Sequence, residues 1–402
     1  MSPDGSPRSP QRYLRALSRA PAFEGMRFGA PEAGARAADE LADPSVREEH
    51  LDRLNRAFAK ADRGELPPPA ELDETRNEVL RHADAAMAKL ARDRSEATLD
   101  RHDRVGLEAV ILLTGRPSLL IKDGDLDLDP ADADLAEWQG TILLARDAMK
   151  ETIRSVGRID QGLYHVGTGF VVAPGLVMTN RHVLQALASE KPGAGGSSQW
   201  TMDARSTIDF AMEYGSTRTS QFAITGVAYS GPTAIGNTLD IGKLDLALLS
   251  VESTNREGEA LPQPLPLSKD PAAGRRTSEV YMVGYPARPA ALPTGQSEEE
   301  LHLVDTLKRV FRMRYGFKRL ALGRITHTLG QVPNDTVPWA IGHDATTLGG
   351  NSGSCVVGLG DEGPLLGLHF GGIFFDHNLA HVFAAVPTLL AAPAASLGLT
   401  WR

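Results

Sequence analysis

From Val156 to the C-terminus, the sequence consists of short apolar runs separated by clusters of Gly, Pro, Asn and Ser. Short runs between turn-forming clusters are typical of β-strands, and many of them in succession predict an all-β barrel or sandwich. The stretch Ser297–Arg314 breaks this pattern and predicts a helical insertion. The strands that we expect are Thr168–Val172, Leu176–Thr179, Asp209–Tyr214, Leu246–Val251, Val280–Val283, Cys355–Val357, Leu365–His369 and His381–Ala384.

The N-terminal part of the chain follows a helical pattern instead. Residues 1–35 are rich in Pro, Gly, Ser and Arg, a composition that predicts a flexible lead-in. Two amphipathic helices are expected over residues 44–63 and 69–92, and the Pro-rich linker between them indicates a helical hairpin. We therefore assign residues 1–104 to a flexible lead-in and a helical accessory region.

A β-hairpin and a linker helix are expected over residues 105–155. The run LEAVILLTGRPSLLIKDG reads as two strands joined by a turn at residues 115–117. From Ala131 to about Arg154, apolar side chains recur every three or four residues, which predicts a helix. This helix would lead into a third region, residues 156–402.

The composition narrows the possible partners. The formal net charge is −9 and no basic run stands out, which argues against a nucleic-acid partner. The cationic stretch Lys308–Lys318 alternates with bulky apolar residues, as in one amphipathic element. No apolar run approaches the ~18 residues of a membrane span, so we expect no membrane partner.

The expected location is the cytoplasm. The N-terminus is polar and rich in Pro and Arg, without the apolar stretch of a signal peptide. The single cysteine, Cys355, cannot form a disulfide within the chain, which favours a reducing compartment.

The stretch GGNSGSCVV, residues 349–357, places Ser352 between glycines, where its hydroxyl has little steric cover. Taken alone, such a stretch is typical of a tight turn before a strand. A serine in this setting is a nucleophile only if a base and an orienting acid accompany it. The rest of the chain therefore decides between the two interpretations.

A candidate base and a candidate acid lie upstream. His182 follows an expected strand in GLVMTNRHVL, and Asp245 begins the apolar strand DLALLSV. Each residue alone is typical of a structural role, and Asp240 is an alternative acid, although no continuous buried strand follows it. Together they supply what a serine nucleophile needs: an imidazole takes the hydroxyl proton, and a carboxylate orients the imidazole. The backbone N–H groups of Gly350 and Ser352 are candidate donors to the developing oxyanion.

Four motifs in this order carry a family resemblance: GTGFVV with GLVMTNRHVL, then DLALLSV, GNSGS and LLGLHFGG. They resemble the trypsin-like (chymotrypsin-fold) serine peptidases, and in particular the bacterial branch that includes the glutamyl endopeptidases. The resemblance covers about Val156–Leu397. It implies a mainly β fold of two antiparallel six-stranded β-barrels, with the site in the cleft between them and a C-terminal helix near Pro387–Leu397.

By the same resemblance, His182 is the general base, Asp245 the orienting acid, Ser352 the nucleophile and Gly350 an oxyanion donor, with no cofactor and no metal. Two positions depart from the family pattern. Digestive trypsin-like enzymes carry, immediately before the nucleophile, an Asp that pairs with a newly cut N-terminus. The residue here is Asn351, so activation by that switch is not expected.

The second departure is Phe370, which stands where many relatives have a Ser that helps to hold the catalytic Asp. The second partner of the acid therefore stays open at this point.

The expected pocket for the side chain before the scissile bond carries no acid at Thr346, so a basic preference has no partner. It offers instead the Thr347 hydroxyl and the His369 imidazole, and Gly371 and Gly372 leave its entrance open. This resembles the glutamyl endopeptidases and predicts a preference for Glu or Asp, since charge-assisted hydrogen bonds to a carboxylate are strong. Small apolar residues are the alternative preference, with His369 as a packing residue.

The predicted function is that of a serine endopeptidase that cleaves proteins or peptides through an acyl-enzyme intermediate. A catalytically silent peptide-binding or scaffold protein on the same fold is one alternative, and an esterase is another. Residues 1–155 carry no motif that points to a family; they could bind a partner or regulator, gate the cleft, or pack on the barrels. The stretch DHNLAH holds two histidines four positions apart, a spacing that does not converge on a metal in a strand and loop.

Overall fold

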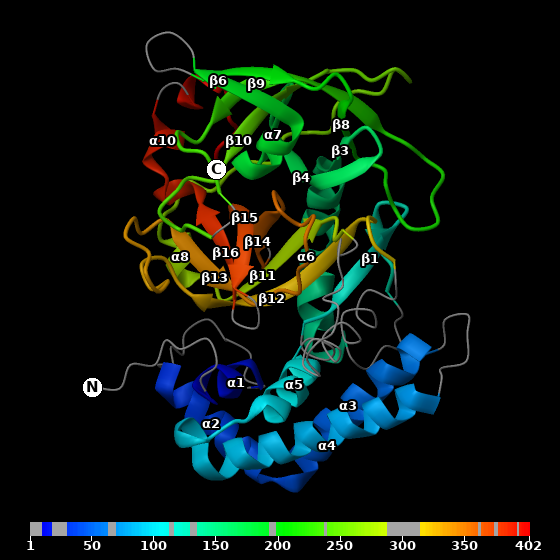
Figure 1. Ribbon diagram of the computed structural model, residues 1–402, viewed down its shortest axis with the longest axis vertical. Coiled ribbons are helices and arrows are strands. Elements are labelled where there is room, and N and C mark those ends of the chain that lie inside the picture. The colour runs from blue at the N-terminus through cyan, green and yellow to red at the C-terminus, as the bar shows by residue number, and fades with distance from the viewer. Residues whose placement is uncertain are drawn as a thin grey trace.

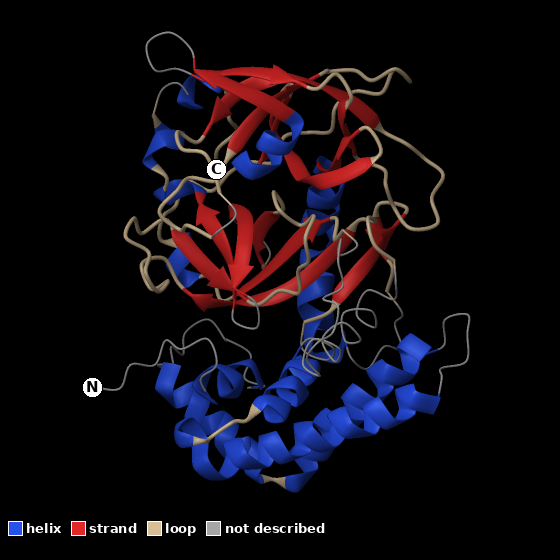
Figure 2. Ribbon diagram, in the orientation of Figure 1, coloured by secondary structure: helices blue, strands red, loops and turns tan. Residues whose placement is uncertain are grey.

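The structure is a computed structural model of the 402-residue chain. It describes residues 10–17, 30–62, 70–111, 116–128, 135–192, 198–236, 239–287, 314–360, 363–373, 377–391 and 394–402. Two β-rich lobes lie one above the other in Figure 1, and the N-terminal helices gather at one end of the molecule, as Figure 2 shows by colour.

Helices dominate the first 155 residues and are short beyond them. The α-helices are α1 (Pro10–Leu17), α2 (Ala30–Ala42), α3 (Pro44–Asp62), α4 (Ala70–Asp93), α5 (Arg101–Val110), α6 (Ala136–Ser155), α7 (Arg181–Leu187), α8 (Ala273–Arg276) and α10 (Pro387–Leu390). Single 3₁₀ turns are formed by Arg94–Glu96, Phe383–Ala385 and Ala394–Leu397.

The strands begin before the barrels, with one hairpin in the N-terminal part. They are β1 (Ser118–Lys122), β2 (Asp125–Leu126), β3 (Val156–Gln161), β4 (Tyr164–Ala173), β5 (Leu176–Thr179), β6 (Ala188–Pro192), β7 (Ser198–Met202), β8 (Ser206–Asp209), β9 (Gln221–Ser230), β10 (Ala247–Val251), β11 (Glu279–Gly284), β12 (Arg319–His327), β13 (Ala340–His343), β14 (Cys355–Gly358), β15 (Leu365–Ile373) and β16 (His377–Val382).

Two antiparallel six-stranded barrels form the centre of the molecule. The first closes in the order β10-β5-β4-β3-β8-β9. The second runs β11-β14-β15-β16-β13-β12 and closes because β11 also pairs with β12. The predicted fold class is therefore confirmed: mainly β, with two barrels and a helical N-terminal region.

Several barrel strands, among them β5 and β14, are buried along their whole length, which explains why their sequences are mostly apolar. Successive side chains of a strand point to opposite sides. On β4, Val171 fills the first barrel, whereas Phe170 and Val172 join a central core outside it. On β11, Met282 fills the second barrel, whereas Tyr281 joins the same central core. This core lies between the barrels and holds them together.

Helix α6 supplies one side of the central core. Its buried side chains recur at helical spacing: Trp138, Ile142, Ala145, Met149 and Ile153. In Figure 1 this helix runs along both barrels, from the helical region towards the first barrel. The predicted linker helix is thus part of the packing between the barrels.

The N-terminal helices α1–α5 have a separate apolar core. The prediction of a flexible lead-in over residues 1–35 is wrong in part, because α1 is a helix and α2 begins at residue 30. The reason lies in three apolar side chains of α1 that occupy one face and are buried in this core: Tyr13, Leu14 and Leu17.

The prediction that the first half of the hairpin is a strand is also wrong. Its residues up to Val110 belong to α5, and Leu107, Val110 and Ile111 are buried in the helical core. These three positions are spaced by three and one, so the same apolar run forms a helical stripe. The hairpin that does form is β1–β2, which starts at Ser118.

Three other expectations are corrected. The strand expected at Asp209–Tyr214 is β8 and ends at Asp209, whose carboxylate accepts the N–H groups of Ala211 and Ser220 and so turns the chain. The last strand ends at Val382 and is followed by a 3₁₀ turn. The C-terminal helix is two short pieces, α10 and Ala394–Leu397.

Other predictions are not decided by these elements. Residues 297–313 of the expected helical insertion lie outside the described residues. The domain boundaries at residues 104 and 155 stay predictions, although β1 pairs with β12 and α6 packs in the central core. Within the described residues, no helix combines the length and apolar character needed to cross a bilayer.

The packing of the central core predicts that substitutions at two neighbouring residues of α6 have very different effects on the free energy of unfolding. Ile142 is 1% exposed and Leu143 is 67% exposed. Ile142→Ala should lower the free energy of unfolding by about 2–5 kcal/mol, because it removes buried methyl groups and leaves a cavity. Leu143→Ala should change it by less than about 0.5 kcal/mol. Urea unfolding of both variants measures the difference, and equal effects would contradict the placement of α6.

Candidate active site

His182 and Asp245 meet because two strands of the first barrel pair. β5 ends at Thr179, which lies opposite Ala247 at the start of β10. The chain then enters α7 through Asn180, so the first turn of the helix lies beside Asp245. The His182 Nδ1 atom lies 2.6 Å from Asp245 Oδ2, and the His182 N–H donates to Asp245 Oδ1 at 2.9 Å.

The aspartate is held on its other sides as well. Its side chain is 4% exposed, whereas that of His182 is 34% exposed. The Asn180 side chain donates to the Asp245 carbonyl at 2.8 Å, and the Asp245 N–H donates to His381 Nε2 at 3.1 Å. The Phe370 ring stacks on the His381 ring, with the two ring centroids 4.0 Å apart. The second partner of the carboxylate, left open by the sequence, is the His182 backbone N–H.

The alternative acid, Asp240, has a different environment. Its side chain is 48% exposed, and it pairs with Lys243 at 3.4 Å and accepts the Gly242 N–H. The geometry therefore favours Asp245 as the acid that orients His182.

The turn that carries Ser352 depends on two glycines in the left-handed region. Gly350 has φ +87° and Gly353 has φ +88°, values that residues with a Cβ rarely adopt. A Cβ on Gly353 would also collide with the Thr168 carbonyl. The turn docks on β4 through two bonds: the Thr168 N–H donates to the Ser352 carbonyl at 2.8 Å, and Thr168 Oγ1 donates to the Gly350 carbonyl at 2.7 Å.

These contacts bring Ser352 into the neighbourhood of His182. A Cβ on Gly167 would contact both the Val183 side chain and the Ser352 carbonyl. Among the hydrogen bonds of the described residues, none joins the Ser352 hydroxyl to the His182 ring. Such catalytic bonds are often long in an unliganded protein and tighten with substrate.

The turn leaves two backbone donors free. In the described part of the chain, the N–H groups of Gly350 and Ser352 have no hydrogen-bond acceptor, whereas that of Asn351 donates to Leu348 O and that of Gly353 to His369 O. Free N–H groups of a nucleophile and of the residue two positions before it can stabilise an oxyanion. Both N–H groups are therefore available to bind an oxyanion.

The expected specificity residues differ in how accessible they are. The Thr347 hydroxyl donates to Asn378 Oδ1 at 2.6 Å, and Asn378 in turn donates to Ala345 O at 2.8 Å. Thr346 is buried, and its hydroxyl donates to the Arg116 carbonyl at 2.9 Å. Gly371 is half-buried and Gly372 is exposed. Thr347 is therefore tied to the second barrel.

His369 belongs to a group of histidines in the wall of the second barrel. It is 3% exposed, and its ring lies 5.4 Å from that of His343. Burial lowers the pKa of His343 to about 4 and lowers that of His369 well below its ordinary value, with His343 and His182 lowering it further. His381 is also fully buried, with its pKa lowered by burial to about 4. All three rings are neutral at pH 7.

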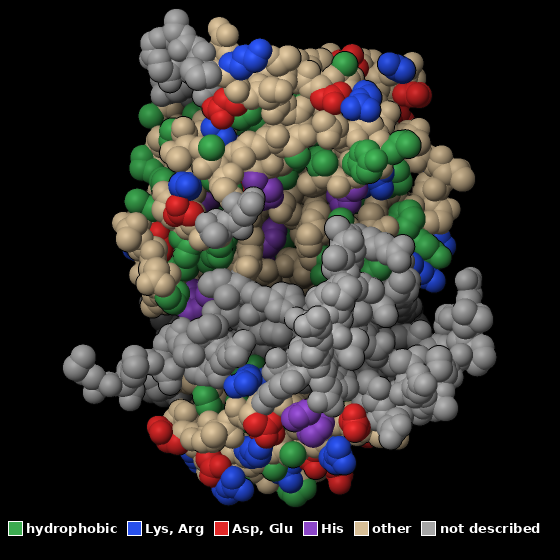
Figure 3. All heavy atoms as spheres, in the orientation of Figure 1, with side chains coloured by type: hydrophobic (Ala, Val, Ile, Leu, Met, Phe, Trp, Pro, Cys, Tyr) green, Lys and Arg blue, Asp and Glu red, His purple; other side chains and the backbone are tan. Residues whose placement is uncertain are grey.

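Figure 3 shows a hollow in this face of the molecule between the two barrels, with histidine side chains around it. Within the described residues, no three histidine, cysteine or acidic side chains come together as a metal site would require. His377 and His381, the two histidines of the DHNLAH stretch, both lie on β16 and are buried.

Two closed antiparallel barrels with a His–Asp pair between them define the chymotrypsin-like class of serine proteases. The trypsin-like peptidase domain matches residues 167–368 of this chain. A relative from Lysobacter enzymogenes, named a probable serine protease, is 35% identical over 389 residues, covering 90% of this chain and 95% of that protein. The chain therefore belongs to the trypsin-like peptidase family and is a serine endopeptidase.

Two solved protease structures align with more than half of the chain. A protease from M. tuberculosis in its active form aligns with a TM-score of 0.36 and 20% identity, covering 65% of this chain and 88% of the other. Neuropsin, a serine protease of mouse brain, aligns with a TM-score of 0.38 and 12% identity, covering 58% and 91%.

Several residues of the site were not found from the sequence. Thr168, Asn180 and His381 hold the nucleophile turn and the aspartate, and His343 packs on His369. Asn180 and Thr168 lie within the quoted motifs, so their positions were a usable signal. No local pattern distinguishes His343 or His381 from other histidines.

The buried histidines predict a pH-dependent stability. His343 is neutral in the folded protein down to pH 4, whereas in the unfolded chain it binds a proton below about pH 6.5. The unfolded state then holds more protons, so stability falls as the pH drops from about 6.5 to 4, by about 1.4 kcal/mol per pH unit for each such histidine. Urea unfolding between pH 7.5 and 4.5 should show this slope, and His343→Leu should reduce it. An unchanged slope would contradict a neutral, buried His343.

Proposed function

We propose that this endopeptidase cuts its substrates with Ser352 as nucleophile, His182 as general base and Asp245 as orienting acid. The observation that carries the proposal is a pair of hydrogen bonds between Asp245 and His182. One joins Asp245 Oδ2 to the ring Nδ1 at 2.6 Å, and the other joins Asp245 Oδ1 to the backbone N–H at 2.9 Å. A carboxylate bonded at Nδ1 leaves Nε2 as the basic nitrogen.

The reaction proceeds in two steps. The Ser352 hydroxyl attacks the carbonyl carbon of the peptide bond while His182 Nε2 takes its proton, and the N–H groups of Gly350 and Ser352 stabilise the oxyanion. The imidazolium returns the proton to the leaving amine, the C–N bond breaks, and an acyl-enzyme remains. A water molecule, deprotonated by His182, then hydrolyses the ester and releases Ser352.

We further propose that the enzyme prefers Glu or Asp before the scissile bond. His369 supports this preference, since a neutral imidazole still has one N–H to donate and a neighbouring carboxylate favours its protonation. The Thr347 hydroxyl donates to Asn378, so in this arrangement it offers no second donor to the substrate carboxylate. A preference for small apolar residues is the alternative for the same open pocket.

The alternatives to peptide hydrolysis stay distinct in their chemistry. A silent scaffold would not react covalently at Ser352, and an esterase would hydrolyse acyl esters but leave peptides intact.

We also propose a cytoplasmic location, which the buried lone cysteine, Cys355, supports. We further propose that the N-terminal helices bind a partner or regulator, because they pack around an apolar core of their own.

The proposed triad predicts large and unequal losses of activity. Ser352→Ala should abolish peptide cleavage, and Asp245→Asn should lower kcat by about 10⁴-fold, because His182 then has the wrong tautomer. Asp240→Asn is the matched control and should retain activity. Peptide cleavage and labelling by a fluorophosphonate measure these effects. Labelled wild-type protein that cleaves esters but no peptide would identify an esterase, and no labelling at all would favour a scaffold.

The proposed specificity predicts the result of a matched peptide series. Peptides that differ only before the scissile bond should be cleaved faster after Glu than after Leu, Ala or Val. His369→Ala should lower the ratio of the Glu rate to the Leu rate, because it removes the donor to the carboxylate. Faster cleavage after the apolar residues, or a ratio that His369→Ala leaves unchanged, would contradict the acidic preference.

A further inference from the structure

Two segments far apart in the sequence share one edge of β12. β1 pairs with its first half, with Ser118 opposite Ala321, and β13 pairs with its second half, with His343 opposite Ile325. The other edge of β12 is taken by β11. The chain therefore enters β1 and leaves β13 at the same place, where Arg116 faces Asp344.

Arg116 and Asp344 form a bidentate ion pair at this junction. The guanidinium donates to the two carboxylate oxygens at 2.6 Å and 2.7 Å, and the side chains are 1% and 10% exposed. The Arg324 N–H donates to the same carboxylate at 2.6 Å. Burial alone would raise the pKa of Asp344, but the Arg116 charge holds it below its ordinary value. Asp344 is thus a charged, fully bonded anchor.

The next residues of the loop are held in place as well. Ala345 crosses directly over Gly323, where any Cβ would collide with its backbone. The Thr346 hydroxyl donates to the Arg116 carbonyl at 2.9 Å. Arg116 therefore binds the loop twice, once through its side chain and once through its main chain.

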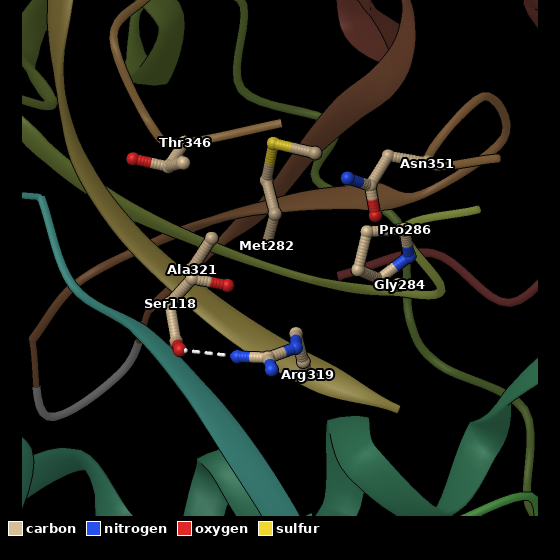
Figure 4. Close-up of a pocket in the computed structure, with 8 residues that line it drawn as sticks. All are labelled: Ser118, Met282, Gly284, Pro286, Arg319, Ala321, Thr346 and Asn351. Carbon is tan, nitrogen blue, oxygen red and sulfur yellow. Dashed lines mark hydrogen bonds between the residues drawn. The ribbon is translucent and has the colours of Figure 1, made fainter. Parts of the chain in front are cut away.

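This loop leads to the oxyanion donors and the nucleophile. The chain continues from Thr346 to Asn351 and Ser352, and Gly349 O accepts the Ala287 N–H at 2.6 Å on the way. A cavity of about 10 Å³, room for about one water, lies beneath the loop. Figure 4 shows its lining, in which Ser118 of β1 lies with Arg319 across from Thr346 and Asn351.

We propose that Arg116 is a positioning residue for catalysis: it anchors the loop 344–351, so that the Gly350 and Ser352 N–H groups meet the oxyanion. The segment before the barrels thereby becomes part of the catalytic unit, and no cut N-terminus is needed to order the loop. This inference rests on the proposed function of Ser352 and its oxyanion donors.

The test separates positioning from stability. Arg116→Met leaves Asp344 charged, buried and without its guanidinium partner, and should lower both Tm and activity. The double variant Arg116→Met/Asp344→Leu replaces the pair by apolar side chains, an exchange that is often neutral for stability. In the double variant, Tm should return towards the wild-type value while kcat stays at least about tenfold lower, because small displacements of catalytic groups cost rate. KM for the same peptide should change less than kcat.

Hydrogen exchange of the full chain measures directly how well the backbone amides of the loop are protected. Backbone amides of residues 345–354 should exchange faster in the double variant. Lys89→Met is the control: it breaks an ion pair with the buried Asp103 in the helical core and should leave these amides and kcat unchanged. Wild-type exchange and wild-type kcat in the double variant would overturn the proposal, whatever its Tm.

A failure of the proposed function gives a different result. If wild-type protein cleaves no peptide and Ser352 takes no fluorophosphonate, the triad is wrong. The exchange data then decide the anchoring alone: faster exchange of residues 345–354 supports it, and unchanged exchange overturns it.

Discussion

Thr168 is the point at which the two barrels are held in register around the site. It is 0% exposed on β4 of the first barrel, and it binds the nucleophile turn of the second barrel through its N–H and its hydroxyl. Its carbonyl accepts the Thr179 hydroxyl at 2.7 Å, three residues before His182. One buried residue thus connects the turn with Ser352 to the strand end with the base. Because buried polar groups are costly when unpaired, this set of bonds resists sliding of one barrel against the other.

The central core keeps that register rigid. Antiparallel sheets commonly leave one face to solvent, but here strands of both barrels are covered on the outside by each other and by α6. A cleft between two barrels is a precise site only if the barrels do not rock. The apolar surface that α6 and the C-terminal residues bury between them provides this restraint, and β1 extends it to the N-terminal segment through its pairing with β12.

The buried histidines near the site destabilise the folded state at low pH, because they stay neutral there while the unfolded chain binds protons. His343, His369 and His381 lie in the wall of the second barrel, where burial keeps them uncharged at pH 7. His381 has a defined task, since it accepts the Asp245 N–H. His343 packs on His369 and lies on β13, the strand that leads to Asp344, so β13 connects the proposed specificity residue His369 to the proposed anchored loop.

The sequence by itself determined the class of fold and the candidate residues of the site. Short apolar runs between turn clusters record the strands locally, and His182, Asp245 and Ser352 each stand in a recognisable stretch of a few residues. Helix or strand at residues 107–111 was decided only by the tertiary structure, because a short apolar run fits both and burial in the helical core selects one. The same holds for the neutral histidines and for the pair of Arg116 with Asp344, 228 residues apart. Local patterns show which side chains must be buried, but closure of the barrels decides which of them meet.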